Sequence, residues 1–128
     1  MTTSDELRAA GREIQGQLWP ATRTASGTGQ FPAARLAPEF FDWVQQSAFG
    51  SVWSREGLAV RDRSMITVAM LAALGQTEEL RVHLLGARNV GLSRDELVEV
   101  LMQSAVYAGV PAAVAALRVA AEVLGDPD

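Results

Sequence analysis

Two side chains four residues apart, Glu79 and His83, could together carry out proton transfer. Residues at positions i and i+4 of an α-helix share a face, and a histidine held by a carboxylate is well suited to acid–base chemistry. His83 is the only histidine in the chain. Both side chains fall in an apolar stripe with Leu80 and Leu84, where an ionisable group is costly unless it is paired or takes part in chemistry. The alternative is structural, with Glu79 fixing His83 as a neutral residue of the core or of a subunit contact.

A helix over residues 77–91 would position this pair. Thr77 is a suitable N-cap because its hydroxyl can accept a backbone N–H of the first turn. The two glutamates that follow it favour the positive end of the helix dipole, and Gly91 suits the left-handed residue that often ends a helix. The preceding residues 60–75 are the most apolar segment of the chain. They predict a helix buried on all sides, at the centre of a bundle or in an oligomer interface, joined to the next helix by a very short turn.

The remaining pattern is also helical. Capping boxes are expected at Thr3 with Glu6 and at Ser93 with Glu96, and Gly50 is expected to end a helix that begins at proline 38. Residues 20–37, rich in small and polar residues and proline, predict a loop. Further helices are predicted over residues 3–18, 38–49, 93–108 and 111–124. The sequence therefore predicts an all-α bundle of five to six helices, with residues 1–36 as an N-terminal helix and loop of the same domain and residues 37–128 as the main helical domain.

Composition excludes several classes of function. The chain has 128 residues, a net charge of −4 and no lysine, and its eleven arginines are scattered, which argues against nucleic-acid binding. Without cysteine, disulfides and thiol chemistry are excluded, and with one histidine a dedicated metal site is not expected. The sequence shows no signal peptide and no apolar run long enough to span a membrane, so we expect a cytoplasmic protein that does not bind membranes.

From Phe49 to Leu124 the sequence resembles the carboxymuconolactone decarboxylase family. The matching segments, in order, are residues 49–58 (FGSVWSREGL), 61–67 (RDRSMIT), 71–75 (LAALG), 78–80 (EEL), His83, 86–91 (GARNVG) and 106–113 (VYAGVPAA). The resemblance implies a fold similar to that of alkylhydroperoxidase D and a homo-oligomer, either a trimer or a hexamer. The thiol branch of the superfamily carries a Cys-x-x-Cys pair where this sequence has Gln76 and Glu79, so thiol peroxidase activity is excluded here.

The resemblance also implies a reaction in the catabolism of aromatic compounds. The family's decarboxylase is a lyase that removes CO₂ from a carboxylated unsaturated lactone without metal or organic cofactor. By this resemblance His83 and Glu79 are the predicted catalytic residues that handle the proton. Arg63, Arg55 and Trp53 are predicted substrate-binding residues, together with Gln76. The alternatives are that the arginines form structural salt bridges and that the tryptophan plugs the core.

One departure from the family keeps the substrate open. The decarboxylases often carry a Gly-(Asp/Glu)-x-His-Val segment after the first helix, whereas residues 18–25 here contain no histidine. A second hypothesis is therefore an enzyme of secondary metabolism that catalyses ring opening, cyclisation or isomerisation with the same proton relay. A third is a non-catalytic helical oligomer in which His83 and Glu79 form a buried strut.

Overall fold

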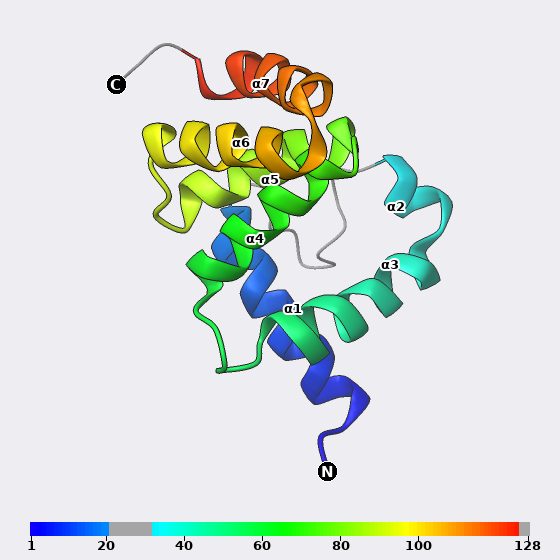
Figure 1. Ribbon diagram of the computed structural model, residues 1–128. Coiled ribbons are helices and arrows are strands. Elements are labelled where there is room, and N and C mark those ends of the chain that lie inside the picture. Colours follow the sequence, from blue (N-terminus) through cyan, green and yellow to red (C-terminus); the bar gives the residue numbers. More distant parts are fainter. Residues whose placement is uncertain (21–31, 126–128) are drawn as a thin grey trace. The chain divides into compact units, whose positions relative to one another are not determined.

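The computed structural model describes residues 1–20 and 32–125 (Figure 1). No strand occurs in these two ranges, so the predicted all-α class is confirmed. The helices are α1 (Ser4–Leu18), α2 (Pro32–Leu36), α3 (Pro38–Val44), the π-helix η2 (Gln45–Trp53), α4 (Val60–Ala73), α5 (Thr77–Asn89), α6 (Arg94–Ala108) and α7 (Val110–Leu124). The chain forms two compact units, residues 1–60 and 61–128, each with internal packing of its own. The domain boundary predicted at residue 37 stays a prediction.

The predicted count of five to six helices is too low, because the described residues hold seven α-helices and a π-helix. One additional helix is α2, in the stretch 20–37 that was predicted as a loop. Residues 21–31 of that stretch lie outside the described residues. Pro32 begins α2, where the missing proline N–H has no helical partner to lose, and two alanines, which are strong helix formers, follow it.

In the first unit, α1 crosses the π-helix at very short distance. A Cβ atom added to Gly11 would lie 2.1 Å from the carbonyl oxygen of Gln45, and one added to Gly50 would lie 2.2 Å from that of Leu7. Only glycine allows two backbones to approach so closely. The side-chain amide of Gln45 also donates a hydrogen bond of 2.7 Å to Gln15 of α1. The prediction that Gly50 ends a helix is therefore wrong, since it is a packing position inside one.

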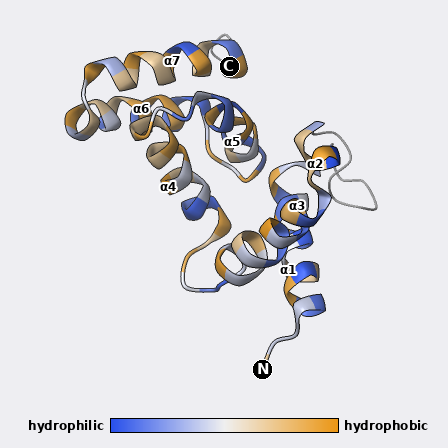
Figure 2. Cartoon of the chain, turned by 90° about the vertical axis from the view of Figure 1, so that its right-hand side faces the viewer, coloured by the Kyte–Doolittle hydropathy of each residue, from blue (hydrophilic) through white to orange (hydrophobic). Residues whose placement is uncertain are grey.

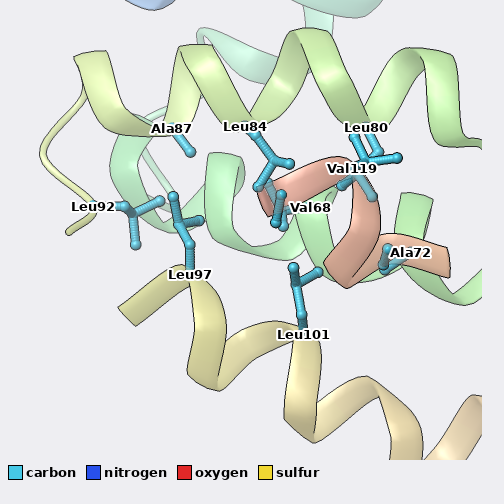
Figure 3. Close-up of a cluster of buried hydrophobic side chains, with 11 residues drawn as sticks. Val68, Ala72, Leu80, Leu84, Ala87, Leu92, Leu97, Leu101 and Val119 are labelled. Atoms are coloured by element: carbon cyan, nitrogen blue, oxygen red, sulfur yellow. The ribbon is translucent and has the colours of Figure 1, made fainter. Parts of the chain in front are cut away.

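In the second unit, α4 to α7 share one hydrophobic core. Figure 3 shows Val68 of α4, Leu84 of α5 and Leu101 of α6 converging on it. The complete cluster is Val68, Ala72, Leu80, Leu84, Ala87, Leu92, Leu97, Leu101, Ala116, Val119 and Ala120. Burial of one leucine side chain contributes about 2 kcal/mol. The small residues of α7 let it pack on α5 and α6. Hydrophobic residues run along α6 and α7 (Figure 2). None of the described helices is long and apolar enough to cross a membrane.

Three predicted helix starts are confirmed. The hydroxyl of Thr3 accepts the backbone N–H of Glu6 at 3.1 Å, and Pro38 occupies the first turn of α3. At Ser93 the full capping box forms, because the hydroxyl accepts the N–H of Glu96 at 3.0 Å while the Glu96 carboxylate accepts the N–H of Ser93 at 3.0 Å. These N-cap interactions form within one helical turn, so they can be predicted from the sequence without knowledge of the tertiary structure.

The turn between α4 and α5 is as short as predicted, but Thr77 is not its N-cap. Gly75 adopts the left-handed conformation with φ of +70°, and the N–H of Gln76 donates back to the carbonyl of Leu71 at 3.0 Å. This closure of α4 makes Gln76 the N-cap of α5, without a side-chain hydrogen bond, and Thr77 becomes the first helical residue. The end of one helix therefore sets the start of the next.

Helix α4 is not buried on all sides within the single chain. Its buried residues are Ser64, Val68 and Ala72, which repeat every four positions along one face. Ile66 and Met70 lie on the exposed side, and 58% of Met70 is accessible to solvent. The prediction of a helix at the centre of a bundle is wrong for one chain, and the exposed apolar face remains to be covered.

Candidate active site

His83 lies in α5, with 8% of its surface exposed, and its neighbour Leu84 is fully buried. The prediction that it sits on the apolar face is confirmed. Burial lowers the pKa of His83 from 6.5 to about 4, because the imidazolium loses its contact with water. At pH 7 the ring is therefore neutral, with one nitrogen as a donor and the other as an acceptor. Such a ring can accept a proton at one nitrogen and offer a hydrogen bond from the other.

Glu79 lies in the first turn of α5 and is exposed. The prediction that both members of the pair are buried therefore holds for His83 and not for Glu79. A carboxylate held against the imidazole would raise its pKa, whereas the pKa of His83 is lowered and burial is the cause. Within the described residues of one chain, Glu79 does not stabilise a charged His83. Its part in proton transfer stays a prediction.

Arg63 and Gln76 belong to the same unit as His83 but lie at opposite ends of α4. Arg63 is half-buried near the start of the helix, where its carbonyl accepts the hydroxyl of Thr67 at 2.8 Å. Gln76 is exposed beyond the other end. Residues 63 to 73 alone span about 15 Å of helix, which exceeds the size of a small lactone. Within one chain, contact of one small substrate with both residues would depend on the reach of their side chains.

Trp53 and Arg55 belong to the first unit. Trp53 is the last residue of the π-helix and is half-buried, and its ring stacks on that of Phe49 with 5.6 Å between centroids and 28° between planes. Arg55 is exposed in the turn that follows, where its N–H donates to the carbonyl of Val52 at 3.1 Å. The six predicted site residues are thus divided between the units, two in the first and four in the second.

Helices α4 and α6 border an open groove of about 610 Å³. Its lining is mainly apolar, with Met70 and Val100 among the larger side chains, and includes the polar residues Glu99, Ser104 and Tyr107. None of the six predicted site residues lines it. The two apolar helices were recognised in the sequence, but a groove between them depends on how they pack, which periodicity does not specify.

Two further residues of interest are not among the six predicted ones. Ser64 is fully buried next to Arg63, and its hydroxyl has no hydrogen-bond partner in the described part of the chain. The sequence pattern that points to Ser64 is its spacing of four positions from Val68, which puts both residues on the buried face of α4. Phe49 stacks on Trp53, and their spacing of four positions was the signal there. Among residues 1–20 and 32–125, no group of three or more His, Cys, Asp or Glu side chains could hold a metal ion.

Residues 38–122, well over half of the chain, match the sequence profile of the carboxymuconolactone decarboxylase family. The chain belongs to this family. The matched region contains all six predicted site residues, because each of them lies between positions 53 and 83. The family that the resemblance predicted is therefore confirmed, and this member of it contains no cysteine.

The chain is similar to three proteins whose names differ. The chain is 44% identical over 88 residues to the 4-carboxymuconolactone decarboxylase of Acinetobacter baylyi, covering 69% of this chain and 66% of that protein. It is 32% identical over 83 residues to the nitrosuccinic acid decarboxylase npaB of Metarhizium robertsii, covering 65% and 58%. It is 30% identical over 96 residues to an uncharacterized 15.0 kDa protein of Paracoccus denitrificans, encoded in the nqo9–nqo10 intergenic region, covering 73% and 72%. The chain thus spans 66% and 58% of the lengths of the first two relatives, less than two thirds of each.

Proposed function

We propose that this protein is a cofactor-independent carboxy-lyase that removes CO₂ from a carboxylated unsaturated lactone of the 4-carboxymuconolactone type. The 44% identity to the decarboxylase of Acinetobacter baylyi carries the proposal. It is supported by the one histidine of the chain, which is buried in α5 within the region that matches the family. A buried imidazole on a rigid helix is held more precisely than one on a loop, which is what proton transfer to a defined atom requires.

The reaction breaks one carbon–carbon bond and forms one carbon–hydrogen bond. The electron pair of the departing carboxylate flows through the double bond into the lactone carbonyl, and the resulting dienolate takes a proton on carbon. His83 delivers that proton, and Glu79 assists it. Arg63 and Arg55 are suited to bind the carboxylates of a dianion, because a guanidinium pairs with a carboxylate through two hydrogen bonds. Trp53 and Gln76 complete the proposed set of substrate contacts.

The similarity to a nitrosuccinic acid decarboxylase favours a second candidate substrate class. In that chemistry a nitro group accepts the electron pair that CO₂ leaves behind, as a conjugated carbonyl does in the lactone. The shared requirement is a carboxylate next to an electron sink and a proton donor for the carbanion. A substrate with a different electron sink would also be consistent with the absence of a histidine from residues 18–25. Most of these residues lie outside the described residues.

The test is turnover by the purified protein and its His83→Gln variant. Lactone consumption is followed by absorbance and CO₂ release by a coupled assay, with nitrosuccinate as the second substrate. Loss of a general acid lowers the rate by about 10²-fold to 10⁴-fold, while the variant keeps its far-ultraviolet circular dichroism. A His83→Gln variant that unfolds, or that keeps its rate per folded molecule, would instead support the structural strut. Glu79→Gln tests the partner in the same assay.

We further propose that the chain assembles with copies of itself, as a trimer or a hexamer, through the apolar faces of α4 and α6. The groove between these helices is bordered by large exposed side chains, with 58% of Met70 and 84% of Tyr107 accessible in the single chain. Exposed apolar patches of this kind mark interaction surfaces. Sedimentation velocity would show an oligomer that Tyr107→Glu dissociates. The matched control is Leu85→Glu, at an exposed position of α5 away from the groove.

A further inference from the structure

An aromatic cluster in the first unit has a more definite geometry than the substrate role proposed for Trp53 requires. The ring of Phe49, buried to 8% exposure, stacks on Trp53 with centroids 5.6 Å apart. On another side it meets the ring of Trp19 edge-on, at 5.9 Å and 79°. Phe49 is therefore held between two tryptophans, one stacked and one perpendicular, both favoured arrangements for aromatic pairs.

The backbone beneath this stack is fixed as well. The N–H of Ser54 donates to the carbonyl of Phe49 at 3.1 Å, and the Ser54 hydroxyl donates to the carbonyl of Gly50. Gly50 in turn packs directly against the backbone of α1, where no side chain would fit. The backbone at Phe49 therefore cannot shift without moving the π-helix against α1. π-Helical segments occur frequently at functional sites, and this one ends on a half-buried tryptophan.

We propose that Phe49 is a positioning residue, which holds the indole of Trp53 as a flat wall against which the unsaturated ring of the substrate stacks. This inference rests on the proposed function, since it names a determinant of substrate binding for the same reaction. Trp53 is half-buried, so part of the residue stays accessible to solvent. A wall that is already rigid before binding loses little side-chain entropy when a planar ring docks on it.

The other aromatic group of the first unit provides a matched control. In α3, the ring of Phe40 contacts those of Phe41 and Trp43, with centroids 5.3 Å and 6.1 Å apart. Their described ring contacts do not include Trp53. A Phe41→Leu change therefore removes the same ring from the same unit without touching the proposed wall.

The experiment combines kinetics with fluorine NMR of protein labelled with 5-fluorotryptophan. Steady-state turnover of the carboxylated lactone is measured for wild type, Phe49→Leu, Trp53→Leu and the double variant, with Phe41→Leu as control. The three tryptophan resonances are assigned by single Trp→Phe changes. Phe49→Tyr, which keeps an aromatic ring, serves as the conservative variant. Far-ultraviolet circular dichroism confirms that each variant is folded, and Trp53→Leu, at a half-buried position, tests the wall independently if Phe49→Leu does not fold.

We expect Phe49→Leu to raise KM about threefold to tenfold with kcat nearly unchanged, because the stack binds substrate and transition state alike. The Trp53 resonance should shift and broaden, Phe49→Tyr should restore both readouts, and the double variant should be no worse than Trp53→Leu alone. The inference would be overturned by an unchanged KM in Phe49→Leu, or by effects of the two changes that multiply in the double variant. The proposed function would still stand in either case if the wild type turns the lactone over. If wild type does not turn the lactone over but the lactone still shifts the Trp53 resonance, and less so in Phe49→Leu, the proposed function fails and the positioning role stands.

Discussion

Replacement of His83 by glutamine should make the stability of the protein less sensitive to acid. The pKa of His83 is lowered by burial from 6.5 to about 4. Between these values the unfolded chain binds a proton that the folded chain does not, so stability rises with pH across this window. The contribution is fully present above pH 6.5 and is lost as the pH falls toward 4. Linkage gives a loss of about 2 kcal/mol between pH 7 and pH 5, and of about 3 kcal/mol over the whole range.

The assay is urea unfolding followed by circular dichroism at pH 7 and pH 5, at one protein concentration for all variants because an oligomer makes stability concentration-dependent. Other groups also titrate, so the informative quantity is the difference between wild type and His83→Gln. Wild type should lose about 2 kcal/mol more than the variant on going to pH 5. Ser64→Ala, which alters a buried polar residue that does not titrate, should parallel wild type. Equal losses in wild type and His83→Gln would refute the neutral, desolvated state of the imidazole.

Three other predictions concern the scaffold. Gly50→Ala should destabilise the fold by about 3 kcal/mol in urea unfolding, since its Cβ would lie 2.2 Å from a carbonyl oxygen of α1, while Gly57→Ala, which meets nothing within 4 Å, should be nearly neutral. Ser93→Ala should cost about 1 kcal/mol of stability in the same measurement, because it removes the N-cap of α6. The N–H of Ser93 and the side chain of Arg61 hold the pKa of Glu96 below its usual value. The folded protein therefore loses stability as the pH falls below the usual pKa of a glutamate, and Glu96→Gln should reduce this loss. NMR titration of Glu96 should show the lowered pKa directly.

Local signals in the sequence predicted most of the helical elements, and long-range packing explains the failures. The caps at Thr3 and Ser93 depend on atoms within one turn, and both formed as predicted. Gly50 is the opposite case. Its meaning depends on α1, about forty residues earlier in the chain, whose backbone occupies the space that a side chain would need. Without that contact a glycine after an amphipathic helix indicates a helix end, and the π-helix was missed for this reason.

The candidate site was predictable to a similar degree. His83 is buried because it lies directly beside the stripe that Leu80, Leu84 and Ala87 define on α5, about 40° around the helix from Ala87. Glu79 lies at the margin of that stripe and in the first turn, where the helix emerges from the core, so it is exposed. A helical projection gives the direction of each side chain but not the width of the buried face. Which residues of the two units share a site is a question of packing that periodicity does not address.

The neutral state of His83 constrains how it can act as an acid. With a pKa of about 4, roughly one molecule in a thousand carries the imidazolium at pH 7. To raise that pKa to 7 requires about 4 kcal/mol of favourable interaction with the charged form. One carboxylate about 4 Å away supplies about 4 kcal/mol at the effective dielectric constant of a protein site. In the free chain Glu79 does not supply it, whereas an anionic substrate at the proposed site brings the required charge. Under the proposed function, binding of the anionic substrate therefore favours protonation of His83. Decarboxylation consumes one proton, and His83 takes up that proton from solvent when the substrate binds.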